Sequence, residues 1–123
     1  MKVKNFYFQI RVPIYRVIVV VYQGPYFKRM AGLFAEHDCT VGEEQVHNNA
    51  TAYYCPQAPI FGIAMSVFDH SPEGYGDLHH EITHVAMRIL ERACVHLSPD
   101  NHEPLSYLIG YLTEKIYDKL IEL

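Results

Sequence analysis

The segment from Val12 to Tyr22 reads VPIYRVIVVVY and constrains the fold more than any other part of the chain. β-branched and aromatic residues dominate it, and Gly24-Pro25 ends it, so it predicts a strand that is buried along most of its length. Its longest apolar stretch, Val17 to Tyr22, is far too short to span a bilayer. We find no signal peptide or anchor and expect no membrane association.

Helical and extended patterns follow one another in the next part of the chain. Tyr26 to His37 carries apolar residues at helical spacing and predicts a short helix. Thr51 to Cys55 predicts a short strand, and Ile60 to Phe68 (IFGIAMSVF) is a better strand candidate. The segment DHSPEGYGD after it contains proline and glycine and predicts a loop.

Two helices are predicted at the end of the chain. Asp77 is a good N-cap residue for a helix from Leu78 to about Cys94. A final helix begins near His102 and carries apolar residues at i, i+3, i+4 and i+7 spacing. Strands and a helix followed by two helices predict an α+β fold with a small mixed or antiparallel sheet, in one domain over residues 1–123.

Composition argues against two classes of protein. Ten basic against fourteen acidic residues give a net charge of −4, which argues against general nucleic-acid binding. The cysteines, Cys39, Cys55 and Cys94, are odd in number and form no CxxC pair, which argues against a disulfide scaffold and a cysteine-built zinc finger. We therefore expect free thiols and a cytoplasmic protein.

Residues 80–84 read HEITH, an HExxH motif on the predicted helix. Residues four apart on a helix differ by about 40° in direction and about 6 Å in height, so His80 and His84 can reach one ion. Zn²⁺ binds neutral imidazoles and keeps one position for water in catalytic sites, and a carboxylate at Glu81 can take a proton from that water. A solvated helix face is the alternative, but the apolar residues of this helix form an arc on its other side.

The start of the final helix offers two candidates for a third zinc ligand. A helix, a short loop and a returning helix bring Glu103 back beside the first helix. His102 is the competing ligand, and we favour Glu103 because Ser106, a small residue three positions later, lets the two helices approach closely. Tyr107, one turn beyond Glu103, could stabilise an oxyanion or simply line the helix packing.

HEITH followed by Glu103 resembles the gluzincin pattern, in which HExxH and a downstream helical glutamate bind catalytic zinc. The span from His79 to Leu120, together with the upstream VPIY strand, is similar to small phage-encoded proteins of the minimal zincin type. The resemblance implies His80, His84 and Glu103 as zinc ligands and Glu81 as the base. It also implies a bacterial host cytoplasm as the place of action.

The sequence thus predicts a small zinc metallopeptidase that acts on a peptide or protein. Glu81 would deprotonate the zinc-bound water and pass the proton to the leaving amine. We expect Ile60–Phe68 to be a sheet edge on which an extended peptide substrate pairs. The alternative is a catalytically silent binding module that engages a host or phage protein, in which zinc holds the two helices together.

Overall fold

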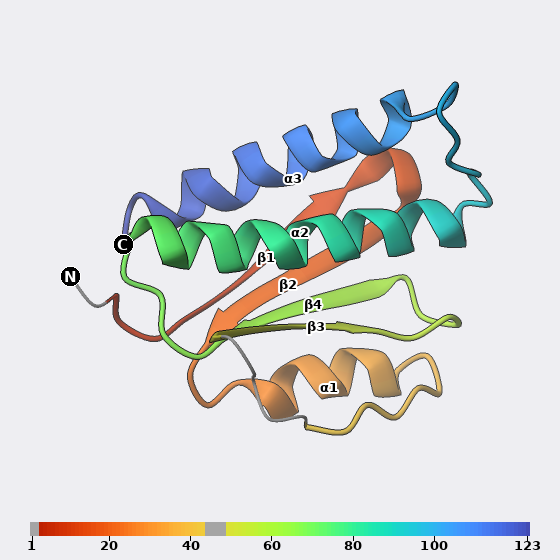
Figure 1. The fold of residues 1–123 in the computed structure, drawn as a ribbon. Coiled ribbons are helices and arrows are strands. Elements are labelled where there is room, and N and C mark those ends of the chain that lie inside the picture. The colour runs from red at the N-terminus through yellow and green to blue at the C-terminus, as the bar shows by residue number, and fades with distance from the viewer. Residues whose placement is uncertain (1–2, 44–48) are drawn as a thin grey trace.

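The computed structural model describes residues 3–43 and 49–123 and has an α+β fold, with helices on both faces of a four-stranded sheet (Figure 1). The predicted fold class is therefore confirmed. The elements are β1 (Phe6–Val12), the short 3₁₀ helix η1 (Pro13–Tyr15), β2 (Val17–Gln23), α1 (Phe27–Ala35), β3 (Ala50–Tyr54), β4 (Ile60–Met65), α2 (Pro72–Arg92) and α3 (Glu103–Leu120). α2 and α3 cover one face of the sheet, and α1 covers the other.

The sheet is mixed, with the strand order β1-β2-β4-β3. β2 and β4 run parallel in its middle, and β1 and β3 flank them as antiparallel edge strands. Both middle strands are buried on both faces: Val19 and Val21 of β2 pack into the core under α2 and α3, whereas Val20 packs into the core under α1. Burial on both faces explains the nearly continuous apolar run in this part of the sequence.

The prediction of one strand over Val12–Tyr22 is wrong, because a turn interrupts it. Pro13 begins η1, and Arg16 closes the turn with a φ of 53° and a hydrogen bond from its N–H to the carbonyl oxygen of Pro13. Proline cannot donate to a strand ladder, so the chain leaves the sheet there. β2 begins only after the turn, and β1 precedes it as the partner strand that the sequence analysis missed.

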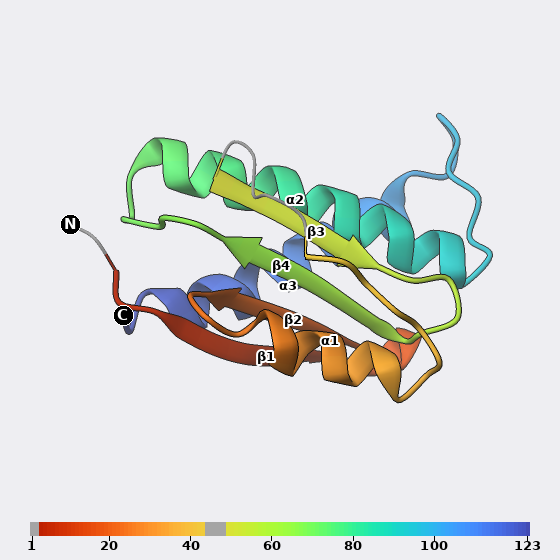
Figure 2. The ribbon, with the colours of Figure 1, turned by 90° about the horizontal axis from the view of Figure 1, so that it is seen from below.

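The predicted edge strand is also in the wrong place. β4 matches the predicted strand Ile60–Phe68 but lies inside the sheet, paired with β2 on one side and β3 on the other. Parallel strands need a long crossover connection, and the chain from β2 to β4 makes it through α1 and β3. The edge strand that lies along α2 is therefore β3 (Figure 2).

α2 begins at Pro72 rather than at Leu78. Its N-cap is Ser71, whose Oγ accepts a hydrogen bond from the Gly74 N–H at 3.0 Å, and proline fits the first helical position. Gly74 and Gly76, which favour a loop in the sequence, lie within the helix. Asp77, the predicted N-cap, consequently lies inside the helix.

The predicted helix within Tyr26–His37 and the predicted final helix are confirmed. α1 lies within Tyr26–His37, and α3 begins one residue after His102. The apolar stripe of α3 is its buried face, formed by Leu108, Leu112, Ile116 and Leu120. None of the helices in the described ranges is long and apolar enough to cross a membrane.

Gly62 lets α1 lie directly on the sheet. A Cβ atom at this position in β4 would collide with the Sδ atom of Met30, which is fully buried in α1. Only glycine leaves room for so close an approach between a strand backbone and a helix side chain.

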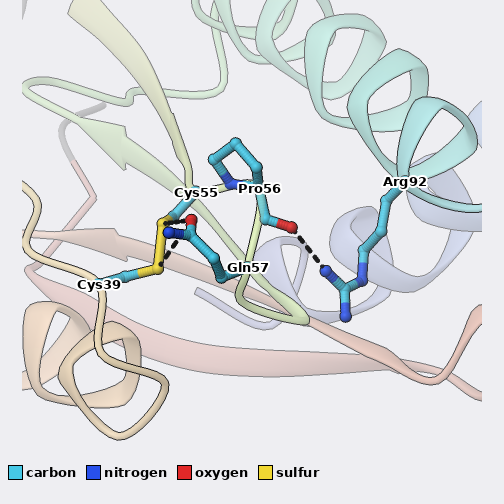
Figure 3. The surroundings of a disulfide bond; sticks show 5 residues. All are labelled: Cys39, Cys55, Pro56, Gln57 and Arg92. Atoms are coloured by element: carbon cyan, nitrogen blue, oxygen red, sulfur yellow. Dashed lines mark hydrogen bonds between the residues drawn. A yellow bond between two sulfur atoms is a disulfide. The ribbon is translucent and has the colours of Figure 1, made fainter.

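Cys39 and Cys55 form a disulfide that joins the chain after α1 to the end of β3 (Figure 3). The prediction of free thiols is therefore wrong for this pair and confirmed for Cys94. Sixteen positions separate the two cysteines, and only the fold brings them together. Beside the bond, Arg92 of α2 donates a hydrogen bond to the Pro56 carbonyl oxygen at 2.9 Å, so the same loop is attached to α2.

Replacing both Cys39 and Cys55 by serine should lower the free energy of unfolding by about 3 kcal/mol, because a disulfide across a loop of this length restricts the unfolded chain. Denaturant titration under oxidising conditions measures the loss. A reductant should destabilise the wild type by a similar amount and leave the double variant unchanged, and Cys94→Ser should have no such effect. Equal stability of the wild type with and without reductant would contradict the prediction.

Candidate functional site

His80 and His84 lie side by side on α2 with the spacing of two ligands of one metal ion. Their Nε2 atoms are 3.1 Å apart, and both side chains are exposed. Two nitrogens bound at about 2.0–2.1 Å to one tetrahedral ion are about 3.3 Å apart. This distance is that of a hydrogen bond between the two rings, and it is close to the separation that two ligands of one Zn²⁺ would have.

The two histidines and Glu81 line one cavity of about 530 Å³ between α2 and β3. Backbone and side chains of β3 form the opposite wall, and Phe61 of β4 contributes from the middle of the sheet. A cavity of this size suits a small ligand or a few residues of a peptide. The structure thus brings together all three residues of the HExxH motif that carry its chemistry.

Glu81 is held in a setting that strengthens it as a base. Burial raises the pKa of its carboxyl group, and the nearby charge of Asp77 adds to the rise. The two histidines and a hydrogen bond from the Ala52 backbone N–H act in the opposite direction and favour the carboxylate. A carboxylate with a raised pKa accepts protons more readily at neutral pH, as a general base must.

Asp77 also lines this cavity, although the sequence analysis assigns it only to a helix N-cap. It lies one helical turn before His80. Its signal was spacing, because positions 77, 80, 84 and 88 follow one face of a helix. A helix that begins at Leu78 with Asp77 as its N-cap, as the sequence predicts, leaves position 77 outside this pattern.

The structure does not bring Glu103 to the histidine pair. α3, which begins at Glu103, runs back in the direction opposite to α2 (Figure 1). Glu103 and Tyr107 line a different groove, between α3 and η1, and Tyr107 is 76% exposed. His102, the alternative ligand, is exposed at the N-cap of α3.

The rotation of α2 explains this separation. His79 faces α3, with its Nε2 atom 3.1 Å from Thr113 Oγ1. His80 is the next residue on the helix, turned by about 100°, and faces β3 instead. Within residues 3–43 and 49–123, no group of three or more His, Cys, Asp or Glu side chains is arranged to hold a metal ion.

No protein-family model, curated protein or solved structure matches this chain.

The free energy of unfolding of Glu81→Gln should differ from that of the wild type in a pH-dependent way when chelator keeps metal away. The raised pKa means that the folded protein holds this proton more tightly than the unfolded chain, whose carboxyl titrates near 4.5. Wild-type stability should therefore fall as the pH rises from that value through the raised pKa, and glutamine should avoid the loss.

Denaturant titrations near neutral pH should give Glu81→Gln a higher free energy of unfolding than the wild type. This difference should disappear below the ordinary carboxyl pKa. A difference that does not change with pH would mean that burial of the charge is not its cause.

Proposed function

We propose that the chain is a zinc-dependent, metallopeptidase-like protein whose site is the cavity between α2 and β3. The observation that carries the proposal is the 3.1 Å separation of the His80 and His84 Nε2 atoms in the cavity that also contains Glu81. The two imidazoles would hold Zn²⁺. Bound there, the ion would polarise a peptide carbonyl and lower the pKa of water.

The roles of the chain's own residues follow from their positions. The Glu81 carboxylate takes a proton from the attacking water and gives it to the leaving amine. The Ala52 N–H fixes that carboxylate against β3. Because β3 is an edge strand along the cavity, an extended peptide would pair with β3 rather than with the predicted Ile60–Phe68 segment.

A second candidate is a binding module without catalysis. The observation that favours it is the hydrogen bond from Ala52 to Glu81, since it already gives this carboxylate a structural role between β3 and α2. Zinc would then stiffen α2 instead of joining α2 to α3, because Glu103 lines another groove. A host or phage protein is the partner that we propose for such a module, and the net charge of −4 disfavours nucleic acid.

We propose a cytoplasmic location, in a bacterial host if the chain is phage-encoded. There the glutathione pool would keep Cys39 and Cys55 reduced. In such a compartment the Cys39–Cys55 disulfide of the structure would form only after oxidation. Alkylation of the protein in fresh lysate, followed by mass spectrometry, tests it: two protected cysteines would place the protein in an oxidising compartment.

Zinc affinity should depend on the histidine pair and not on the start of α3. His84→Ala should weaken Zn²⁺ binding by more than about a hundredfold, since loss of a direct ligand exceeds the usual effect of a supporting residue. Glu103→Ala and His102→Ala should leave the affinity unchanged. Competition against a chromophoric chelator measures all three, and a loss in Glu103→Ala equal to that in His84→Ala would restore the gluzincin ligand set.

Glu81→Gln should keep stoichiometric zinc and lower the cleavage rate of a peptide library by at least about a hundredfold, the usual contribution of a general base. The glutamine side chain preserves size and the contact with Ala52 but cannot accept the proton. Zinc analysis and mass spectrometry of the cleaved peptides provide the measurements. Zinc-loaded wild type that cleaves nothing would select the binding module, and full activity in Glu81→Gln would exclude this mechanism.

A further inference from the structure

Arg88 continues the line of functional residues on α2. It lies one helical turn beyond His84 and lines the same cavity as His80 and Glu81. It also lines a neighbouring hollow of about 400 Å³, together with His84 and residues at the end of α2. Among the described residues that line these two cavities, Arg88 is the only lysine or arginine.

The Arg88 guanidinium is held from two sides. Its Cζ atom stands 4.2 Å from the centre of the Tyr54 ring on β3, in a cation–π contact. Its Nη1 atom donates to Glu91 Oε2 at 3.1 Å, as the sequence spacing of three predicts. In the part of the chain that the structure describes, these contacts leave Nε and Nη2 without a hydrogen bond, and 41% of the side chain is exposed.

A guanidinium held in this way is suited to a planar anion. Arginine presents pairs of parallel N–H donors that match the two oxygens of a carboxylate, and stacking on an aromatic ring fixes their plane in advance. Glu91 is a partner that a ligand can displace, because this ion pair is exposed and such pairs contribute little.

We propose that Arg88 binds the C-terminal carboxylate of a peptide substrate, so that the protein removes one or two residues from the end of a chain. The proposal rests on the function proposed above. Residues four apart on a helix are about 6 Å apart along the axis, and an extended peptide advances about 3.3–3.6 Å per residue. The rise from His84 to Arg88 thus matches one or two residues of an extended peptide, so a carboxylate bound at Arg88 would leave a peptide bond one or two residues upstream at the level of His84.

The reaction is an ordinary hydrolysis. The C–N bond of that peptide breaks, the hydroxyl of water joins the acyl carbon, and the proton that Glu81 receives goes to the amine of the released fragment. No oxidant, reductant or second substrate is needed. The competing role for Arg88 is a purely structural one, as a brace between α2 and Tyr54 of β3.

The test compares acetylated trialanine with its C-terminal amide, because the two peptides differ only in the group that Arg88 would bind. Binding is first measured on the metal-free protein in chelator, by NMR shifts of the backbone amides of α2 and β3, which every variant retains. The free acid should bind at least about tenfold more tightly than the amide, as expected for a charge-assisted hydrogen bond. Arg88→Gln should abolish this preference, and Arg88→Lys should retain part of it.

Arg92→Gln is the matched control. Arg92 lies one turn further along α2, lines neither cavity, and contacts the Pro56 carbonyl oxygen. This variant should keep the preference for the free acid. The proposal is overturned if the wild type binds the acid and the amide with equal affinity. It is also overturned if Arg88→Gln lowers the affinity for both peptides equally, because Arg88 then has only a structural role between α2 and β3.

Cleavage by the zinc-loaded protein separates this proposal from the one on which it rests. If the metal-free protein shows an Arg88-dependent preference for the acid but the zinc-loaded protein cleaves neither peptide, the carboxylate site is supported and the peptidase activity is contradicted. If cleavage depends on Glu81 but is equally fast for the acid and the amide, the peptidase activity is supported and carboxylate binding by Arg88 is contradicted. Faster cleavage of the acid, lost in Arg88→Gln, is the result expected.

Discussion

The parallel pairing of β2 and β4 determines where the residues of the candidate site lie. Two parallel neighbours cannot be joined by a tight turn, so the chain must leave the sheet between them. It does so through α1 on one face and then adds β3 outside β4. The helix that follows β4 returns over the other face and meets β3 along its length. The cavity is the space that this path leaves between a helix and an edge strand.

Burial then decides which side of α2 faces that space. Ile82, Ala86 and Ile89 are fully buried, and their side of the helix cannot turn toward water. His79 lies beside this buried side and contacts α3, whereas His80 and His84 are left to face β3. The chemistry of the site therefore depends on apolar residues that never touch it, because they fix the rotation of the helix.

The sequence was sufficient to find the HExxH motif, its helix and its exposed side, since all three follow from local spacing around His80. It was not sufficient for Glu103, because a ligand on α3 requires knowledge of which side of α2 that helix packs against. The disulfide and the inner position of β4 escaped prediction for a similar reason, because Cys39 meets Cys55, and β2 meets β4, only through long-range packing. The turn at Pro13 was missed for a different reason. Proline is a local signal for a turn, but the run of valines after it favours a strand more strongly.

Phe61 lines the cavity, while its neighbours in β4, Ile60 and Gly62, face the core under α1. One face of β4 thus lines the cavity, and the opposite face of the same strand packs against α1. The Met30 Sδ atom occupies the space that a Cβ at Gly62 would need, so added volume on the α1 side would press on this strand. The shape of the cavity can accordingly be tuned from the far side of the molecule, by repacking α1, while every residue that lines it keeps its identity.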